Sequence, residues 1–372
     1  NDANPNRDFA RHVLFDRVIS RWNNSSGATI ANTHYITVRN SSFSHNGQTG
    51  IGSNRTRYVY WDNNDFIGNN WRIGLLGGIY GDSPAGTKLL SHSDVTIENS
   101  RFIGNFTSGL WFDYANENMV VNRVTSLHNW GVGFYNEANY GPVTADYLLI
   151  RQNGNHPDSE IAEGGILWAE ANAFTINNSY LIDNYYYGVG VRTRDRTSTA
   201  YWSGTPYDGR CRNLRVYNTL MVASRNTTKL YQSSAAKING NAIANHVHSQ
   251  QAYFISELLP TYVAANNRYY SPYTTTIFSS ATDSGNLGYN EVNLATWQSS
   301  TGQDTGSVWD PNYQSRLGFD SFQESGGLVA FEAENYHTYD QRSDTARWFV
   351  GTGYQAAEYI GASGWGYMKT LN

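Results

Sequence analysis

An asparagine recurs at nearly regular intervals through the first half of the chain. It closes seven copies of one short pattern in which apolar and polar residues alternate, and these copies end at Asn23, Asn46, Asn69, Asn105, Asn129, Asn153 and Asn184. Successive positions differ by 23, 23, 36, 24, 24 and 31 residues. A basic period of about 23 residues with insertions is typical of a solenoid, because so short a unit cannot bury its inward face without stacking on its neighbours.

The pattern within each copy predicts strands rather than helices. Side chains alternate with a period of two, so each copy is expected to form a strand, a turn and a second strand. Asparagines at the same corner of successive coils can form a ladder of amide hydrogen bonds along the axis. Asparagine also tolerates left-handed backbone at such a corner. Helical repeats would need periods of 33 residues or more, and leucine-rich repeats would need regular leucines; the sequence has neither.

With these repeats, roughly residues 10–250 resemble the pectate-lyase-like superfamily of right-handed parallel β-helices. The resemblance implies an all-β fold, a right-handed parallel β-helix built from coils of about 23 residues. That fold hosts lyases, hydrolases, epimerases and phage adhesins, so it does not select a function. We predict a parallel β-helix over residues 1–250, followed over 251–325 by degenerate terminal coils, a cap and a linker.

A new pattern begins at residue 326. Residues 326–338 resemble the first strand of the family 6 and family 35 carbohydrate-binding modules, which are β-sandwiches. In those families the two acids of the Glu-Ala-Glu stretch, here Glu332 and Glu334, help to ligate a structural calcium. The alternative is an acidic strand without a metal. Residues 326–372 are too few for a whole module, so we predict a truncated, N-terminal part of one. Such modules usually accompany polysaccharide-degrading enzymes.

The composition and the charge limit the kinds of molecule that the chain is expected to bind. The net charge is −5 and no basic run is present, which argues against nucleic acid. No run of 18 apolar residues exists, so no membrane-spanning helix is predicted. The 28 Tyr and 11 Trp offer flat apolar faces with polar edges, which suit stacking on sugar rings, although stacked coils also use aromatic residues as filler. We expect a secreted monomer that acts on a polysaccharide without an organic cofactor. The single cysteine, Cys211, cannot form an intramolecular disulfide.

When the strands that come after the corner asparagines are aligned, acidic residues fall at equivalent positions and form a row. A glycine opens each of these strands, at Gly109, Gly133, Gly165 and Gly188. The fifth position then holds Asp113, Glu137 and, in the last strand, Arg192. Glu170 falls one residue late in its strand, and a small bulge could restore its register. Because stacked coils lie about 4.8 Å apart, Asp113 and Glu137 are expected about 5 Å apart, with Glu170 about 10 Å from Asp113.

Aromatic residues accompany the acids. Trp111 and Tyr135 lie two positions before Asp113 and Glu137, and Trp168 has the same place relative to Glu170. These three are therefore predicted to bind substrate on the same face. Insertions at 77–93, 156–163 and 196–212 interrupt the repeat, and loops that protrude from a regular scaffold commonly form the walls of a cleft.

Two reactions fit this row, and hydrolysis is favoured. Neighbouring carboxylates resist ionising together, which is how a glycosidase obtains a proton donor beside an ionised partner. A separation near 5 Å favours retention of configuration and one near 9 Å favours inversion. We leave the stereochemical outcome open.

A lyase that uses β-elimination on a uronic acid polymer is the alternative enzyme. Arg192 and Arg194 would bind the substrate carboxylate, and Asp113 with Glu137 would hold calcium. Lys88, assigned to the first insertion, is the one lysine near this end. His45 and His128 precede corner asparagines and are expected to be corner residues rather than bases. A non-catalytic glycan-binding β-helix and a purely structural surface protein are the alternatives to an enzyme.

Overall fold

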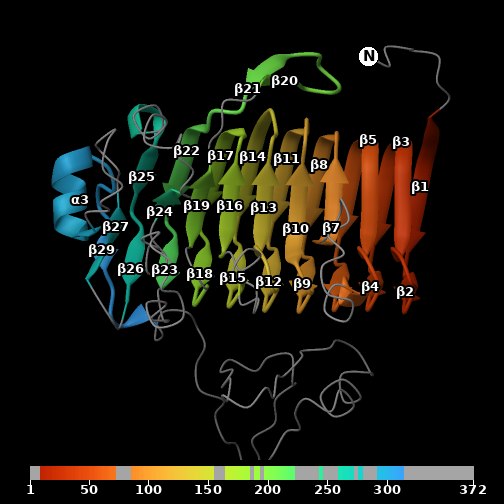
Figure 1. Cartoon of the computed structure of the whole chain (residues 1–372), viewed down its shortest axis with the longest axis horizontal. Coiled ribbons are helices and arrows are strands. Elements are labelled where there is room, and N and C mark those ends of the chain that lie inside the picture. The colour runs from red at the N-terminus through yellow and green to blue at the C-terminus, as the bar shows by residue number, and fades with distance from the viewer. Residues whose placement is uncertain are drawn as a thin grey trace, which may run out of the picture. The chain divides into compact units, whose positions relative to one another are not determined.

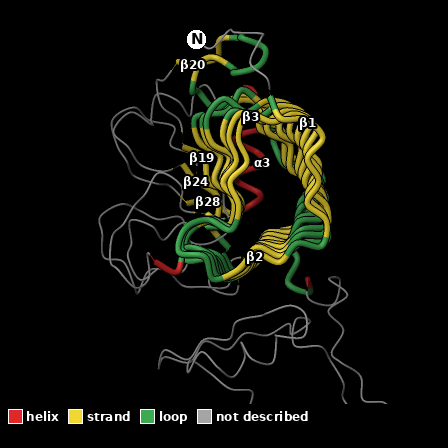
Figure 2. The backbone as a smooth tube through the Cα atoms, turned by 90° about the vertical axis from the view of Figure 1, so that its right-hand side faces the viewer, coloured by secondary structure: helices red, strands yellow, loops and turns green. Residues whose placement is uncertain are grey.

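The computed structural model describes residues 9–72, 85–154, 164–184, 188–192, 197–222, 243–245, 259–271, 275–279 and 291–313. They form a right-handed parallel β-helix in which each regular coil contributes a strand to each of three faces (Figures 1 and 2). Within the described residues, the first two faces join into a 15-stranded sheet through two long strands, and the third face is a 10-stranded sheet. The predicted fold class is confirmed.

Strands of each face pair in parallel along the axis. The first face consists of the N-terminal halves of β3 (Ala28–Arg39) and β5 (Ile51–Asp62), then β7 (Ala85–Leu90), β10 (Ser108–Asp113), β13 (Phe134–Glu137), β16 (Ile166–Ala169), β19 (Val189–Arg192) and β24 (Ile243–Asn245). The second face consists of β1 (Ala10–Asp16), the C-terminal halves of β3 and β5, then β8 (Ser93–Glu98), β11 (Glu117–Asn122), β14 (Gly141–Asp146), β17 (Asn172–Asn177), β22 (Arg212–Tyr217) and β25 (Val263–Ala265). The third face consists of β2 (Ile19–Arg21), β4 (Ser42–Ser44), β6 (Asp65–Ile67), β9 (Arg101–Ile103), β12 (Thr125–Leu127), β15 (Leu149–Arg151), β18 (Tyr180–Ile182), β23 (Leu220–Val222), β26 (Arg268–Tyr270) and β29 (Val308–Trp309).

The predicted asparagine ladder is present and continuous. The side-chain amide of each corner asparagine donates to Oδ1 of the next one, over 2.8–3.1 Å, from Asn23 to Asn184. Each Oδ1 also accepts the backbone N–H of the preceding asparagine. From Asn46 onward the ladder is fully buried, so these hydrogen bonds form away from water.

The left-handed backbone lies one residue before the position that we expected. The residues with positive φ at this corner immediately precede the ladder asparagines, among them His45 (φ 53°), Gly104 (φ 59°) and His128 (φ 53°). The ladder asparagines themselves do not have positive φ. The side chains of these asparagines form the ladder, and the residue before each of them makes the tight turn. This geometry confirms that His45 and His128 are corner residues.

Inward-facing aromatic and aliphatic side chains form one continuous core. On the third face, Phe43, Phe66 and Phe102 are fully buried and their rings stack along the axis with centroids 5.7 and 4.8 Å apart. Because successive coils place the same kind of residue at the same height, the side chains of this continuous core form columns along the axis. This regular packing holds the outward-facing side chains of neighbouring coils in register.

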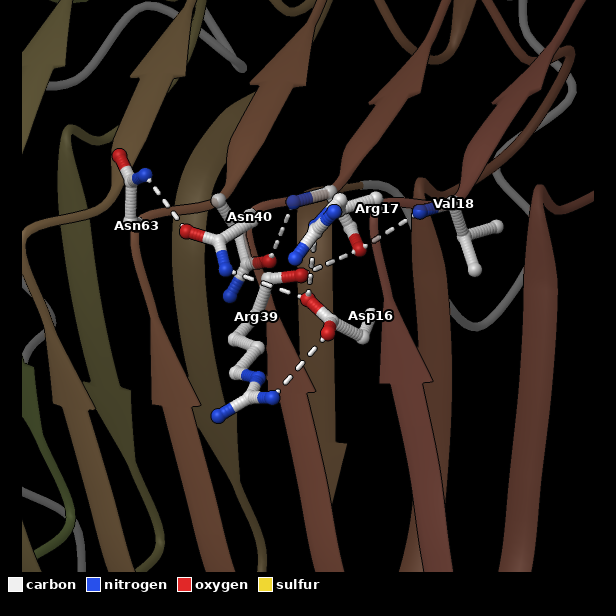
Figure 3. A network of polar contacts seen from close by, with 8 residues as sticks. Asp16, Arg17, Val18, Arg39, Asn40 and Asn63 are labelled. Carbon is white, nitrogen blue, oxygen red and sulfur yellow. Dashed lines mark hydrogen bonds and ion pairs between the residues drawn. The ribbon is translucent and has the colours of Figure 1, made fainter.

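Polar side chains also form columns on the outer corner between the second and third faces (Figure 3). Arg39 donates to Asp16 over 3.1 Å, and the Asn40 amide donates to the same carboxylate over 3.2 Å. Asn63 in turn donates to Asn40 over 2.9 Å. The hydrogen bonds from Arg39 and Asn40 lower the pKa of Asp16. These contacts are exposed, so they contribute little to stability.

Two irregular features interrupt the coils. A hairpin, β20 (Thr197–Thr199) with β21 (Pro206–Asp208), arises within the predicted insertion at 196–212. Near the C-terminal end lie η2 (Leu259–Thr261), the antiparallel pair β27 (Thr276–Ser279) and β28 (Glu291–Asn293), and helix α3 (Leu294–Thr301). Trp297 of α3 is buried against Phe278, with ring centroids 5.5 Å apart. Strands β25, β26 and β29 lie in the segment predicted to hold degenerate terminal coils.

Some predictions concern residues outside the described ones. The truncated carbohydrate-binding segment 326–372, with the calcium ligands predicted at Glu332 and Glu334, is among them, as is Arg194. Within the described part of the chain, none of the helices has the length and apolar character needed to span a bilayer.

The corner histidine His45 makes stability depend on pH. Burial, with a smaller contribution from the charge of Arg21, lowers its pKa to about 4. The unfolded chain, with an ordinary histidine pKa near 6.5, takes up the proton first as the pH falls. The free energy of unfolding should therefore decrease between about pH 6.5 and about pH 4, by at most about 1.4 kcal/mol per pH unit from this residue.

Urea unfolding of the wild type and of His45→Asn at pH 7 and pH 5 would check this expectation. Asparagine accepts the left-handed conformation of this position and does not titrate. The variant should lose less stability than the wild type between the two pH values. Equal losses would contradict the assignment.

Candidate active site

Asp113 and Glu137 lie side by side on the outer surface of the first face. They end β10 and β13, two adjacent parallel strands, and are direct partners in the pairing register. Both side chains are partly exposed, whereas the residues before them, Phe112 and Asn136, point inward and are buried. The predicted alignment of these two acids is confirmed. Strand spacing places their backbones about 5 Å apart.

Trp111 and Tyr135 form a stacked pair in the next outward row. They are register partners, and their rings lie 5.0 Å apart and nearly parallel, at 14°. Lys88 of β7 approaches Trp111 from the opposite side, with Nζ 3.8 Å from the ring centroid. Both faces of the Trp111 ring are therefore covered by protein. The Trp111 faces are thus occupied by Tyr135 and Lys88, and the predicted role of this pair in substrate binding stays a prediction.

Lys88 lies beside Asp113, at a place that the sequence did not lead us to expect. It lies in strand β7 rather than in an insertion loop, and its Nζ forms an ion pair with Asp113 over 2.9 Å. The two side chains are only 9% and 18% exposed, so the pair is mostly shielded from water. A signal was available, because Gly86-Thr87-Lys88 repeats the spacing of Gly109-Leu110-Trp111. The lysine thus occupies the same column as Trp111 and Tyr135.

Glu170 and Trp168 do not join this row. Strand β16 pairs with β13 without a bulge, so Ala169 stands opposite Glu137 and Leu167 opposite Tyr135. Trp168 faces the core and is fully buried. Glu170 follows the strand at a left-handed corner (φ 52°) and is also fully buried. The predicted bulge is wrong, since the continuous parallel pairing of four residues leaves no extra residue to restore the register. Neither side chain reaches the outer surface beside Asp113.

Arg192, another of the predicted residues, lies farther along the first face. Arg192 ends β19 opposite Ala169, two strands beyond Glu137, and its backbone is described while its side chain is not. Its predicted carboxylate contact therefore stays a prediction. No three His, Cys, Asp or Glu side chains gather into a possible metal site within the described ranges.

The Lys88–Asp113 pair is expected to matter for stability far more than an exposed pair. Lys88→Met would leave the Asp113 carboxylate without its cation, and breaking a buried ion pair costs about 3 kcal/mol or more. Arg39 and Asp16 provide an exposed control pair at the corner between the second and third faces, at 3.1 Å and with the arginine 46% exposed. Arg39→Met should cost under about 1 kcal/mol. Chemical unfolding of both variants measures the difference, and equal losses would contradict the shielding of the Lys88 pair.

Comparisons with known proteins agree with the architecture. Residues 7–157 match the family model described as the right-handed β-helix region. Together with the three parallel faces, this match defines the class: the chain is a right-handed parallel β-helix protein. No curated protein sequence matches it.

Several solved structures are similar to this chain. The A-module of the mannuronan C-5 epimerase AlgE6 from Azotobacter vinelandii is 14% identical with a TM-score of 0.51, covering 81% of this chain and 65% of that one. The AlgE4 A-module from the same organism is 17% identical, with a TM-score of 0.47 and coverages of 70% and 60%. The Streptococcus pneumoniae surface adhesin PfbA is 12% identical, with a TM-score of 0.31 and coverages of 68% and 64%. The chain thus spans 60–65% of the length of these structures, and likeness at such identities concerns the fold alone.

Proposed function

We propose that this protein is a glycoside hydrolase that cleaves a polysaccharide on the outer surface of the first face. The observation that carries the proposal is the side-by-side placement of Asp113 and Glu137 on adjacent parallel strands. The two side chains leave backbones that lie about 5 Å apart, which is close to the carboxyl separation of retaining glycosidases. The fold supplies this spacing directly, because it equals the distance between coils.

The ion pair with Lys88 suggests different roles for the two acids. The Lys88 ammonium group lies 2.9 Å from Asp113 and fixes the position of its carboxylate, which suits a nucleophile. Glu137 then serves as the proton donor. Asp113 attacks the anomeric carbon while Glu137 protonates the departing glycosidic oxygen, and a glycosyl ester forms. In the second half, Glu137 takes a proton from water, which attacks the same carbon and releases Asp113 as a carboxylate.

A second reaction is favoured by one observation, the presence of Lys88 in the row. A lysine among carboxylates could bind the acid group of a uronic acid residue, as removal of the proton beside that group requires. The similar fold of a mannuronan C-5 epimerase module is compatible with an acidic polysaccharide as ligand. β-Elimination on a uronic acid polymer, with calcium assistance, is therefore the alternative proposal. In either case we propose that the protein acts outside the cell.

A polysaccharide panel tests the proposal, with products scored by reducing ends and by absorbance near 235 nm. Reducing ends without the absorbance would support hydrolysis, and proton NMR of the first product should then show the anomeric configuration of the substrate. An inverted product would overturn the assigned roles, and both signals together would establish elimination. Binding to a glycan without either signal would instead support the non-catalytic alternative.

A further inference from the structure

The β20–β21 hairpin extends along the corner between the first and second faces. Its tip is a tight turn in which Ala200 N–H donates to Thr205 O over 2.9 Å and Gly204 N–H donates to Ala200 O over 3.0 Å. In Figure 1 the hairpin lies above the ends of the strands and points back toward the N-terminal coils. We call residues 197–208 the arm. Its side chains contact several coils that precede it in the sequence.

A buried glutamate holds the tip of the arm. Oε1 of Glu117, the first residue of β11, accepts the backbone N–H groups of Trp202 over 2.8 Å and Ser203 over 2.9 Å. Glu117 is only 4% exposed, and hydrogen bonds to a shielded carboxylate are stronger than neutral ones. The indole N–H of Trp202 also donates to Ser91 O over 3.0 Å. The Trp202 ring packs 5.2 Å from that of His34.

The arm also holds the two corners that follow the acidic pair. Tyr201 N–H donates to Ala115 O over 3.5 Å, two residues after Asp113. The Tyr207 hydroxyl donates to Ala138 O, one residue after Glu137. Ala115 and Ala138 have left-handed backbone, with φ of 62° and 50°, which costs an alanine about 1–2 kcal/mol. These corners would relax more readily without the external hydrogen bonds.

We propose that Glu117 and Tyr207 are positioning residues, which act through the arm to hold Asp113 and Glu137 at their working separation. This inference rests on the proposed function of the pair. Glu117 latches the tip, and Tyr207 fixes the corner after Glu137. Because catalysis falls steeply with small misplacements, release of the arm should affect turnover more than substrate binding.

Three variants distinguish loss of the hydrogen bonds of Glu117 and Tyr207 from loss of folding. Glu117→Ala removes the acceptor of both tip N–H groups, while Glu117→Gln keeps a side-chain oxygen and should largely rescue the loss. Tyr207→Phe removes the hydroxyl that donates to Ala138 O and remains informative if Glu117→Ala folds poorly. Glu98→Ala is the control, since Glu98 accepts a hydrogen bond from Tyr60 on the exposed second face, away from the arm.

Hydrogen exchange of the arm, the side-chain carboxyl 13C shifts of Asp113 and Glu137, and steady-state kinetics are then compared. In Glu117→Ala, exchange at residues 197–208 should speed up, both 13C shifts should move, and kcat should fall roughly 10- to 100-fold with little change in KM. Tyr207→Phe should move the Glu137 shift and lower kcat to a smaller extent. Glu98→Ala should change none of these quantities.

Faster exchange of the arm with unchanged 13C shifts and unchanged kcat would overturn the proposal. Carboxyl shifts are measured without substrate, so they decide the positioning role even if no glycan is cleaved. A protein that cleaves no polysaccharide but shows the shift changes would refute the proposed function alone. Normal cleavage with a released arm would refute the positioning role alone.

Discussion

Asp113→Asn and Glu137→Gln should each lower kcat on the cleaved polysaccharide by roughly 1,000-fold or more, because each removes one of the two groups that the bond cleavage requires. If Asp113 is the nucleophile, azide should restore turnover in Asp113→Asn with a glycosyl azide of inverted configuration. If Glu137 is the proton donor, Glu137→Gln should retain much more activity on an aryl glycoside whose leaving group needs no proton. Initial rates and product NMR measure these effects.

Loss of folding must be separated from loss of chemistry in these variants. Asp113→Asn removes the carboxylate that pairs with the shielded Lys88 ammonium group, so it should also destabilise the protein. The double variant Lys88→Met/Asp113→Asn removes both charges and should recover stability without recovering activity. Asp16→Asn, which breaks the exposed pair with Arg39, is the control for a lost carboxylate. Full activity in Asp113→Asn or Glu137→Gln would remove that residue from the catalytic pair.

Asn105→Ala should lower the free energy of unfolding by about 4 kcal/mol, which is more than the loss expected at the exposed ladder residue Asn23. The Asn105 amide donates to Phe66 O over 3.0 Å and to Asn129 Oδ1 over 2.8 Å. Its Oδ1 accepts both the backbone and the side-chain N–H of Asn69, over 2.9 and 3.1 Å. Truncation leaves these partners buried without hydrogen bonds, and each such group costs about 1–3 kcal/mol.

The first rung of the same ladder provides the control. Asn23 donates to Asn46 in the same way but is exposed, so water can replace it there. Asn23→Ala should therefore cost about 1 kcal/mol or less. Equilibrium unfolding in guanidinium chloride measures both variants. Similar losses at the two positions would show that burial of the ladder does not set its contribution.

The arrangement of Asp113 and Glu137 could be read from the sequence because it depends on local repetition. Each acid is the fifth residue of a strand that a glycine opens, and a coil must close with the same geometry as the coil beneath it. Register in stacked strands then follows from counting residues between equivalent corners. The same logic, applied to Gly86, would have placed Lys88 in the column of Trp111.

Counting residues along the strands gave the wrong side-chain orientation where a shift of one residue reverses it. A shift of one position turns a side chain from the surface to the core, so Trp168 and Glu170 were placed outside when both are buried. Nothing in the local pattern distinguishes a coil with a bulge from one without. The hydrogen bonds with the neighbouring strand decide whether a bulge is present.

The sequence by itself determined the coil period, the ladder of asparagines and the pairing of Asp113 with Glu137, because each follows from identical units that repeat at short range. Only the tertiary structure decided the ion pair between Lys88 and Asp113, and the docking of Trp202 on Glu117, 85 residues apart in the sequence. These contacts join side chains from different coils and an insertion of irregular length. Periodicity can place Lys88 in a column, but it does not set where the ammonium group lies, and it does not predict the docking of the arm. The energy of both contacts comes from shielding polar groups that meet only after the coils have stacked.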